Sequence, residues 1–413
     1  MEPGSAVDIA KQSLLVFGTI LAVGTLSGLL ARKIRVPDVA LFLIAGMLLG
    51  PAVADLVHIR ANSPLNQLIL IFGSCYILFD GGASLRMKVL KEVWITIVGL
   101  STAGVAITAL ITGYAAHLVL GVPLIVAMLL GATLASTDPA TLVPIFKQVR
   151  IRDRVAQTVM SESAFNDAMG AIATFTVLGI AVGAGDFSLG AVVFKLAKDS
   201  LLGIAAGGVL GYLAALLIAH EKWNFLAEYA PVVTLMAVVG AYMAADGLAA
   251  SGFMAVFAFG IVIGNKDAFG FVMKRGEERR LEEFVITTAL IMRMFIFILL
   301  GTQVDFNLMN RYLAGGAVVV TALMLVARPV TVFACAWPDR RARWSIQELL
   351  FICWTRETGV IPAALAGLLV GIKAPGADMI ASVTFIAVLM TILIQAPTTR
   401  WLAGRLGLLE ERP

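Results

Sequence analysis

Charged side chains lie inside several long apolar stretches of this sequence. The acidic ones are Asp138, Glu162, Asp167 and Glu357, and the basic ones are Arg328 and Arg356. An ionised side chain at the centre of a bilayer costs about 2.5–3.5 kcal/mol on insertion scales, so such residues pair with one another or line the path of an ion or proton. Their chemistry is therefore the first clue to function.

Asp138 is followed directly by Pro139, which cannot continue the hydrogen-bond ladder of a helix. We expect the helix to loosen here and to free carbonyl groups and the Thr137 hydroxyl beside a carboxylate. Oxygen ligands of this kind suit a hard cation. A proline kink with a capping aspartate is the structural alternative, but a kink alone requires no acid in lipid.

The segment SESAFND (161–167) carries polar side chains at helical spacing. Ser163 and Asp167 are four residues apart and share one helix face, and Glu162 and Asn166 share the adjacent face. We expect the first pair to face one neighbouring helix and the second pair to face another. Helix packing alone is the structural alternative.

A buried Glu162 needs a cationic partner, because an unpaired buried ion is costly. Arg356, in a second interrupted stretch, is its predicted partner, and together they would brace the site. Arg328, which precedes Pro329, is a further cation that could stabilise the break or a carboxylate.

The composition identifies the elements that must position these residues. Apolar residues make up 60% of the 413 residues and charged residues only 14%. Apolar stretches of about 18 to 25 residues recur throughout, and each is long enough to cross a bilayer core of roughly 30 Å. We therefore expect an all-α polytopic membrane protein, with residues 1–413 forming a single transmembrane domain and no soluble regulatory domain.

Thirteen transmembrane helices are predicted, and the fifth, sixth and eleventh to thirteenth are expected to be the most tilted or irregular. They are residues 12–31, 36–53, 65–80, 93–116, 122–146, 155–182, 199–219, 229–245, 250–265, 284–301, 312–336, 345–371 and 379–399. The charged segment 270–283 is expected to form a helical cytoplasmic linker. With the N-terminus outside and the C-terminus in the cytoplasm, 22 of the 31 basic residues lie on the inner side, as the positive-inside rule requires.

Two predicted helices are interrupted at corresponding positions. STDPAT (136–141) interrupts the fifth, and RETGVIP (356–362) interrupts the twelfth. Paired broken helices of this kind indicate inverted repeats with a binding site at mid-membrane. We assign residues 1–182 and 229–405 to the two six-helix repeats and residues 199–219 to the helix that links them.

These residues resemble the monovalent cation–proton antiporter superfamily, and in particular its NhaP-type sodium/proton exchangers, over nearly the whole chain. The most specific matches are Thr137-Asp138, Glu162-Ser163, Asn166-Asp167, Arg328 and Arg356. One departure concerns the residue after Arg356, because members of the family often have glycine where this chain has Glu357.

The resemblance implies an NhaA/NhaP-like fold and a homodimer in which a core domain moves against a scaffold. It assigns Asp167 as the carrier carboxylate and places Na+ at Asp138 and Asp167. Thr137, Ser163 and Glu162 would lie at or beside the ion, and Asn166, Arg356 and Arg328 would support the site. An asparagine before the essential aspartate is similar to the electroneutral branch of the superfamily.

The expected function is electroneutral exchange of protons for Na+ (or Li+) across a prokaryotic plasma membrane, with no cofactor, no enzymatic activity and no nucleic-acid partner. A K+/H+ antiporter of the same fold is one alternative, and a sodium-coupled symporter of an organic anion is another. A channel would favour repeated rings of ligands over one asymmetric cluster. An intramembrane aspartyl hydrolase would need Asp138 and Asp167 to share a proton.

Overall fold

The computed structural model of the protein describes residues 6–34, 36–59, 63–137, 146, 151–183, 189–221 and 223–410. Helices account for the regular structure throughout these ranges. The first half contains α1 (Ala6–Ile34), α2 (Asp38–Leu49), α3 (Pro64–Ala83), α4 (Met87–Ser101), α5 (Ala103–Leu120), α6 (Leu124–Thr133), α8 (Asp153–Ala181) and α9 (Leu189–Ala219). The second half contains η1 (Ala227–Tyr229), α10 (Ala230–Gly247), α11 (Gly252–Gly264), η2 (Lys266–Phe269), α12 (Arg275–Thr302), α13 (Phe306–Ala322), η3 (Leu323–Ala327), α14 (Arg328–Cys335), α15 (Ile346–Trp354), α16 (Val360–Gly371), α17 (Ala377–Met390), η4 (Thr391–Gln395) and α18 (Ala396–Arg405).

Nine helical stretches in the described ranges are long and apolar enough to cross a membrane, and four shorter apolar helices accompany them. Each predicted segment coincides with one helix or with consecutive helices, except that residues 138–145 of the segment 122–146 lie outside the described residues. The all-helical fold class is thus confirmed, whereas the count of thirteen crossings and the inverted repeats stay predictions.

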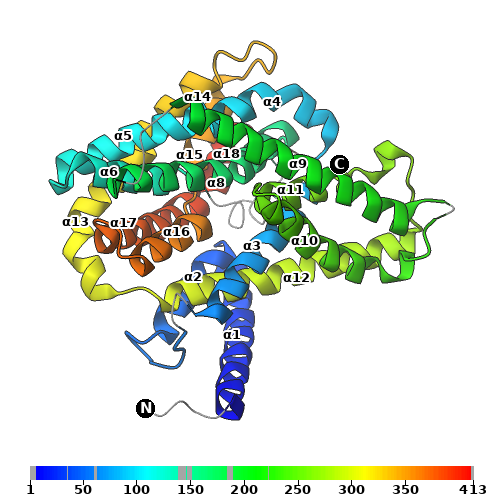
Figure 1. Ribbon diagram of the computed structural model, residues 1–413, viewed down its shortest axis with the longest axis horizontal. Coiled ribbons are helices and arrows are strands. Elements are labelled where there is room, and N and C mark those ends of the chain that lie inside the picture. The colour runs from blue at the N-terminus through cyan, green and yellow to red at the C-terminus, as the bar shows by residue number, and fades with distance from the viewer. Residues whose placement is uncertain are drawn as a thin grey trace.

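The helices pack into two groups. The scaffold group consists of α1, α2, α3 and α9 to α12, in which α11 packs on α3 and α9, and α12 packs on α2. The core group consists of α4, α5, α6, α8 and α13 to α18, in which α5 packs on α6, α4 on α8 and α13 on α17. Contacts within each group are dense and contacts between them are sparse. Figure 1 shows α9, α10 and α11 on one side and α5, α6, α13 and α17 on the other.

Small residues allow the scaffold helices to approach closely. A Cβ atom added at Gly46 on α2 would lie 2.1 Å from the Ile298 carbonyl oxygen on α12. A Cβ atom at Gly260 on α11 would lie 2.5 Å from the Phe79 carbonyl oxygen on α3. Close backbone contact of this kind replaces the hydrophobic effect as the force between helices in lipid.

The structure corrects one detail of the helix prediction and refines two others. The predicted span 93–116 is divided at Thr102, where φ is −112° and ψ is −81°. The sixth span, which was expected to be tilted or irregular, is the uninterrupted helix α8. The charged segment 270–283 is helical from Arg275, as expected, but α12 continues through it into the following span, so it is no separate linker.

The eleventh and thirteenth spans are irregular, as expected. Each contains one π-helical turn, η3 before Arg328 and η4 at Thr391–Gln395. Turns of this kind recur at functional sites, because one additional residue redirects the side chains that follow.

Candidate functional site

The core group contains the second interrupted helix and the described part of the first, up to residue 137. In the first, α6 ends at Thr133, and Ser136 and Thr137 are non-helical. The predicted ion ligand Asp138 lies outside the described residues. In the second, α15 ends at Trp354 and α16 begins at Val360, which confirms the predicted break.

Asp167 lies on α8 opposite the first break and is only 1% exposed. The Ser136 hydroxyl donates a hydrogen bond to Asp167 Oδ1. The Thr137 hydroxyl lies 2.8 Å from Ser163 Oγ. A carboxylate and three hydroxyl oxygens therefore gather in a buried place, and these are the ligands that a hard cation prefers.

Asn166 links α8 to the first break through hydrogen bonds to Thr137. Its Oδ1 accepts a hydrogen bond from the Thr137 backbone N–H at 3.1 Å, and its Nδ2 lies 2.9 Å from Thr137 Oγ1. Asn166 therefore shares a neighbour with Ser163 and Asp167. The prediction that it faces the same neighbour as Glu162 is wrong, because positions 163, 166 and 167 form one i, i+3, i+4 face toward the break.

The predicted pairing of Glu162 with Arg356 is also wrong. Glu162 forms a two-point ion pair with Arg328, in which Nη1 donates to Oε1 and Nη2 donates to Oε2 at 2.8 Å. Both side chains are almost fully buried. The π turn η3 immediately precedes Arg328, and it changes the register of the residues that follow.

Arg356 instead caps the end of α6. Its Nη2 donates to the carbonyl oxygens of Leu134 at 2.6 Å and Ala135 at 3.0 Å. The last carbonyl groups of a helix have no partner within the helix and carry a partial negative charge. The Arg356 guanidinium supplies both the hydrogen bonds and the opposite charge at that end.

The second break is held in the same way as the first. The Thr358 backbone N–H donates to Thr391 Oγ1 at 3.0 Å, and Gln395 Nε2 donates to the Trp354 carbonyl oxygen at 2.7 Å. Thr391, the acceptor, and Gln395, the donor, both belong to η4, which therefore packs against this break. Glu357, between Arg356 and Thr358, has no solvent exposure.

Ser136 is the site residue that the sequence analysis did not single out. It belongs to the motif STDPAT, two residues before Asp138. A hydroxyl beside a predicted helix break was the available signal, but its contact with Asp167 depends on how the break lies across α8.

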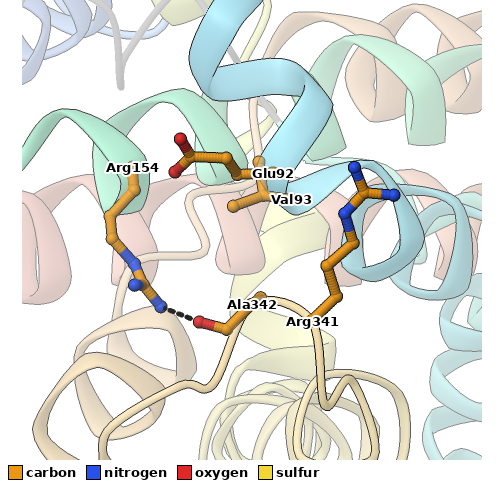
Figure 2. A pocket seen from close by; sticks show the side chains of 5 residues that line it. All are labelled: Glu92, Val93, Arg154, Arg341 and Ala342. Carbon is orange, nitrogen blue, oxygen red and sulfur yellow. Dashed lines mark hydrogen bonds between the residues drawn. The ribbon is translucent and has the colours of Figure 1, made fainter.

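A separate cavity of about 130 Å³ lies at one end of the core group, where α4 and α8 meet the loop between α14 and α15 (Figure 2). Arg154 extends into it and donates from Nη2 to the Ala342 carbonyl oxygen at 2.6 Å. Its Nε lies 3.2 Å from Glu348 Oε1. These contacts fasten the loop to α8, and the cavity is distinct from the Asp167 cluster.

Comparison with known proteins identifies the relatives of this chain. A family model described as sodium/hydrogen exchanger, transmembrane, matches residues 18–405. The Na+/H+ antiporter 1 of Methanocaldococcus jannaschii is 32% identical over 414 residues, which cover 95% of this chain and 94% of that protein. The K+/H+ antiporter NhaP of Alkalimonas amylolytica is 29% identical over 96% of this chain and 68% of that protein.

A solved structure leads to the same family. The sodium proton antiporter MjNhaP1 from Methanocaldococcus jannaschii at pH 8 matches with a TM-score of 0.78 and 27% identity, over 96% of this chain and 99% of that chain. The resemblance stated from the motifs is therefore confirmed. With a family model that spans nearly its whole length, this chain belongs to the sodium/hydrogen exchanger family of membrane proteins.

Proposed function

We propose that this protein exchanges protons for Na+ across a prokaryotic plasma membrane, with Asp167 as the carrier carboxylate. The observation that carries the proposal is the buried oxygen cluster formed by Asp167, Ser136, Thr137 and Ser163. Relatives named Na+/H+ antiporters support the same activity.

The exchange follows from competition for one carboxylate. Asp167 crosses the membrane either protonated or with a bound cation, because the empty charged carrier is costly to bury. The Ser136, Thr137 and Ser163 hydroxyls supply neutral ligands to a dehydrated cation. Asn166 is neutral, so Asp167 carries the same charge in both directions and exchange is electroneutral.

K+ is the second candidate for the cation. The relatives differ in the cation that their names give, since the Methanocaldococcus jannaschii protein is named a Na+/H+ antiporter and the Alkalimonas amylolytica protein a K+/H+ antiporter. Titration of the exchange rate with Na+, Li+ and K+ at one pH distinguishes the two cations.

Paired irregularities support the proposed inverted repeats. Gly46 on α2 and Gly260 on α11 make equivalent close contacts, and the Thr102 interruption corresponds to η3. Thr137 and Thr358 each donate a backbone hydrogen bond to a side chain on the helix that follows the break. Each feature of the first half recurs about 220 residues later, as two repeats of one fold would require.

A contact between Thr108 and Thr331 supports the same proposal. Their Oγ1 atoms lie 3.0 Å apart, and these residues occupy equivalent positions on α5 and α14 under the same offset. When two repeats are related by a two-fold axis, a residue of one repeat can contact the equivalent residue of the other only close to that axis. The axis of the proposed repeats therefore passes between them.

Contacts between loops support the proposed topology. Three contacts connect segments on the predicted inner side. They are an ion pair between Arg86 and Asp153 and hydrogen bonds between Arg154 and Ala342 and between Arg152 and Leu408. The predicted outer ends join through Gln303 with Asn66, and Ser251 with Asp199. The basic side faces the cytoplasm under the positive-inside rule, with the N-terminus outside. We also propose a homodimer, which the family resemblance implies.

Reconstituted vesicles test the proposed function. Wild-type protein should dissipate a preformed proton gradient when Na+ is added, read as recovery of a pH-sensitive fluorophore. Asp167→Asn should abolish this recovery, because an amide cannot alternate between a proton and a cation. Asp305→Asn is the matched control, since Asp305 caps α13 at an exposed end, and it should retain exchange. Wild-type rates in Asp167→Asn vesicles would refute the carrier role.

A further inference from the structure

Glu357 is a fully buried carboxyl group that the proposed exchange does not use. It lies in the break between α15 and α16, directly after Arg356. Burial of a carboxylate costs its hydration, and a nearby opposite charge is one of the interactions that compensate the loss. Its position therefore calls for an account in terms of the charges around it.

Two buried arginines belong to the same helix group as this carboxyl, and one of them, Arg356, is the residue directly before it. Arg328 engages both oxygens of Glu162, whereas the two Arg356 contacts go to the carbonyl oxygens of Leu134 and Ala135, which are neutral acceptors. Arg356 and Glu357 are neighbours in the break and both are buried, so water screens the interaction between their charges only weakly. Because Glu162 pairs with Arg328, Glu357, the residue directly after Arg356, is a carboxylate placed to offset the second positive charge.

The charge of Arg356 acts close to the ion cluster. Its acceptors, Leu134 and Ala135, directly precede Ser136, whose hydroxyl contacts Asp167. A net positive charge on the Arg356 side would repel an entering cation. At an effective dielectric constant of about 20, one unit charge about 10 Å away changes cation affinity roughly tenfold.

We propose that Glu357 is a positioning residue that balances Arg356 and thereby maintains the cation affinity of the Asp167 cluster. The inference rests on the proposed antiport function, which it deepens by assigning a determinant of cation affinity. In this role Glu357 acts through the charge of Arg356 and not as a ligand of the cation.

Kinetics in vesicles test this role. Glu357→Gln keeps the shape of the side chain and removes its charge, so the KM for Na+ should rise roughly tenfold while the maximal rate changes less than about twofold. Glu357→Asp should restore most of the affinity. Glu348→Gln is the matched control, because Glu348 is a buried glutamate on α15 that pairs with Arg154, and it should leave the KM for Na+ unchanged.

A double-mutant cycle in thermal stability tests the charge balance between Arg356 and Glu357 without a transport measurement. Thermal unfolding in detergent should show Arg356→Gln/Glu357→Gln to be less destabilised than the sum of its single variants, since only the singles leave one buried charge unopposed. Additive losses, or a wild-type KM for Na+ in Glu357→Gln, would overturn the inference. Absence of exchange by the wild-type protein would instead refute the proposed function, and the cycle would still report on the charge balance.

Discussion

At the scale of single residues, Glu162 and Arg328 form a buried two-point ion pair within the core group. Both side chains are buried, so removal of either partner leaves a charge that nothing hydrates. We expect Glu162→Gln to lower the free energy of unfolding by about 3–5 kcal/mol. Thermal unfolding in detergent measures this, and Glu162→Gln/Arg328→Gln should recover part of the loss.

The exposed pair of Arg279 and Glu283 on α12 is the control for that prediction. Its Nε–Oε1 distance is 2.8 Å, but the side chains are 80% and 65% exposed. Arg279→Gln should leave the melting temperature close to that of the wild-type protein, because water screens a surface ion pair. Equal melting temperatures for Glu162→Gln and Arg279→Gln would contradict a stabilising role of the buried ion pair between Glu162 and Arg328.

At the scale of elements, the break between α15 and α16 depends on Thr391 of η4. Its hydroxyl accepts the Thr358 backbone N–H, which lies in a buried segment. Thr391→Val preserves the side-chain shape and leaves that N–H without its acceptor, so we expect a loss of about 1–3 kcal/mol in unfolding free energy. Thr321→Val on α13 is the control, since the Thr321 hydroxyl is exposed and bonds only to the Ala317 carbonyl within its helix. Similar losses in both variants would argue against a special role for the break.

The same element shows what the sequence could and could not predict. The break at 356–362 and the polar face of 161–167 were predictable, because hydropathy, glycine and helical spacing are local properties. The partner of Glu162 was not, because it depends on η3. A π turn adds one residue, and one residue rotates all later side chains by about 100°. The interruption at Thr102 was not predictable either, because no neighbouring proline marks it in the sequence.

At the scale of the whole molecule, a glycine-packed scaffold group adjoins a core group that holds Asp167, Glu357 and the Glu162–Arg328 ion pair. Contacts within each group are much denser than those between them, which is the arrangement that movement of one group against the other requires. Asp167, Asn166 and both breaks belong to the core group. A moving core would therefore carry the cation cluster as a unit, and the charge on that unit would decide how transport responds to voltage.

Electroneutral exchange makes a quantitative prediction at this scale. A net charge that crosses in each cycle would couple transport to the membrane potential by about 2.3 kcal/mol per 100 mV, which corresponds to roughly a 50-fold change in the equilibrium gradient. Wild-type vesicles should show no such change when an ionophore sets or collapses the potential. Asn166→Asp places a second carboxylate beside Asp167, so its exchange should become dependent on voltage. A voltage-dependent wild-type protein would show that a second charge travels with Asp167, and it would remove the role assigned to Asn166.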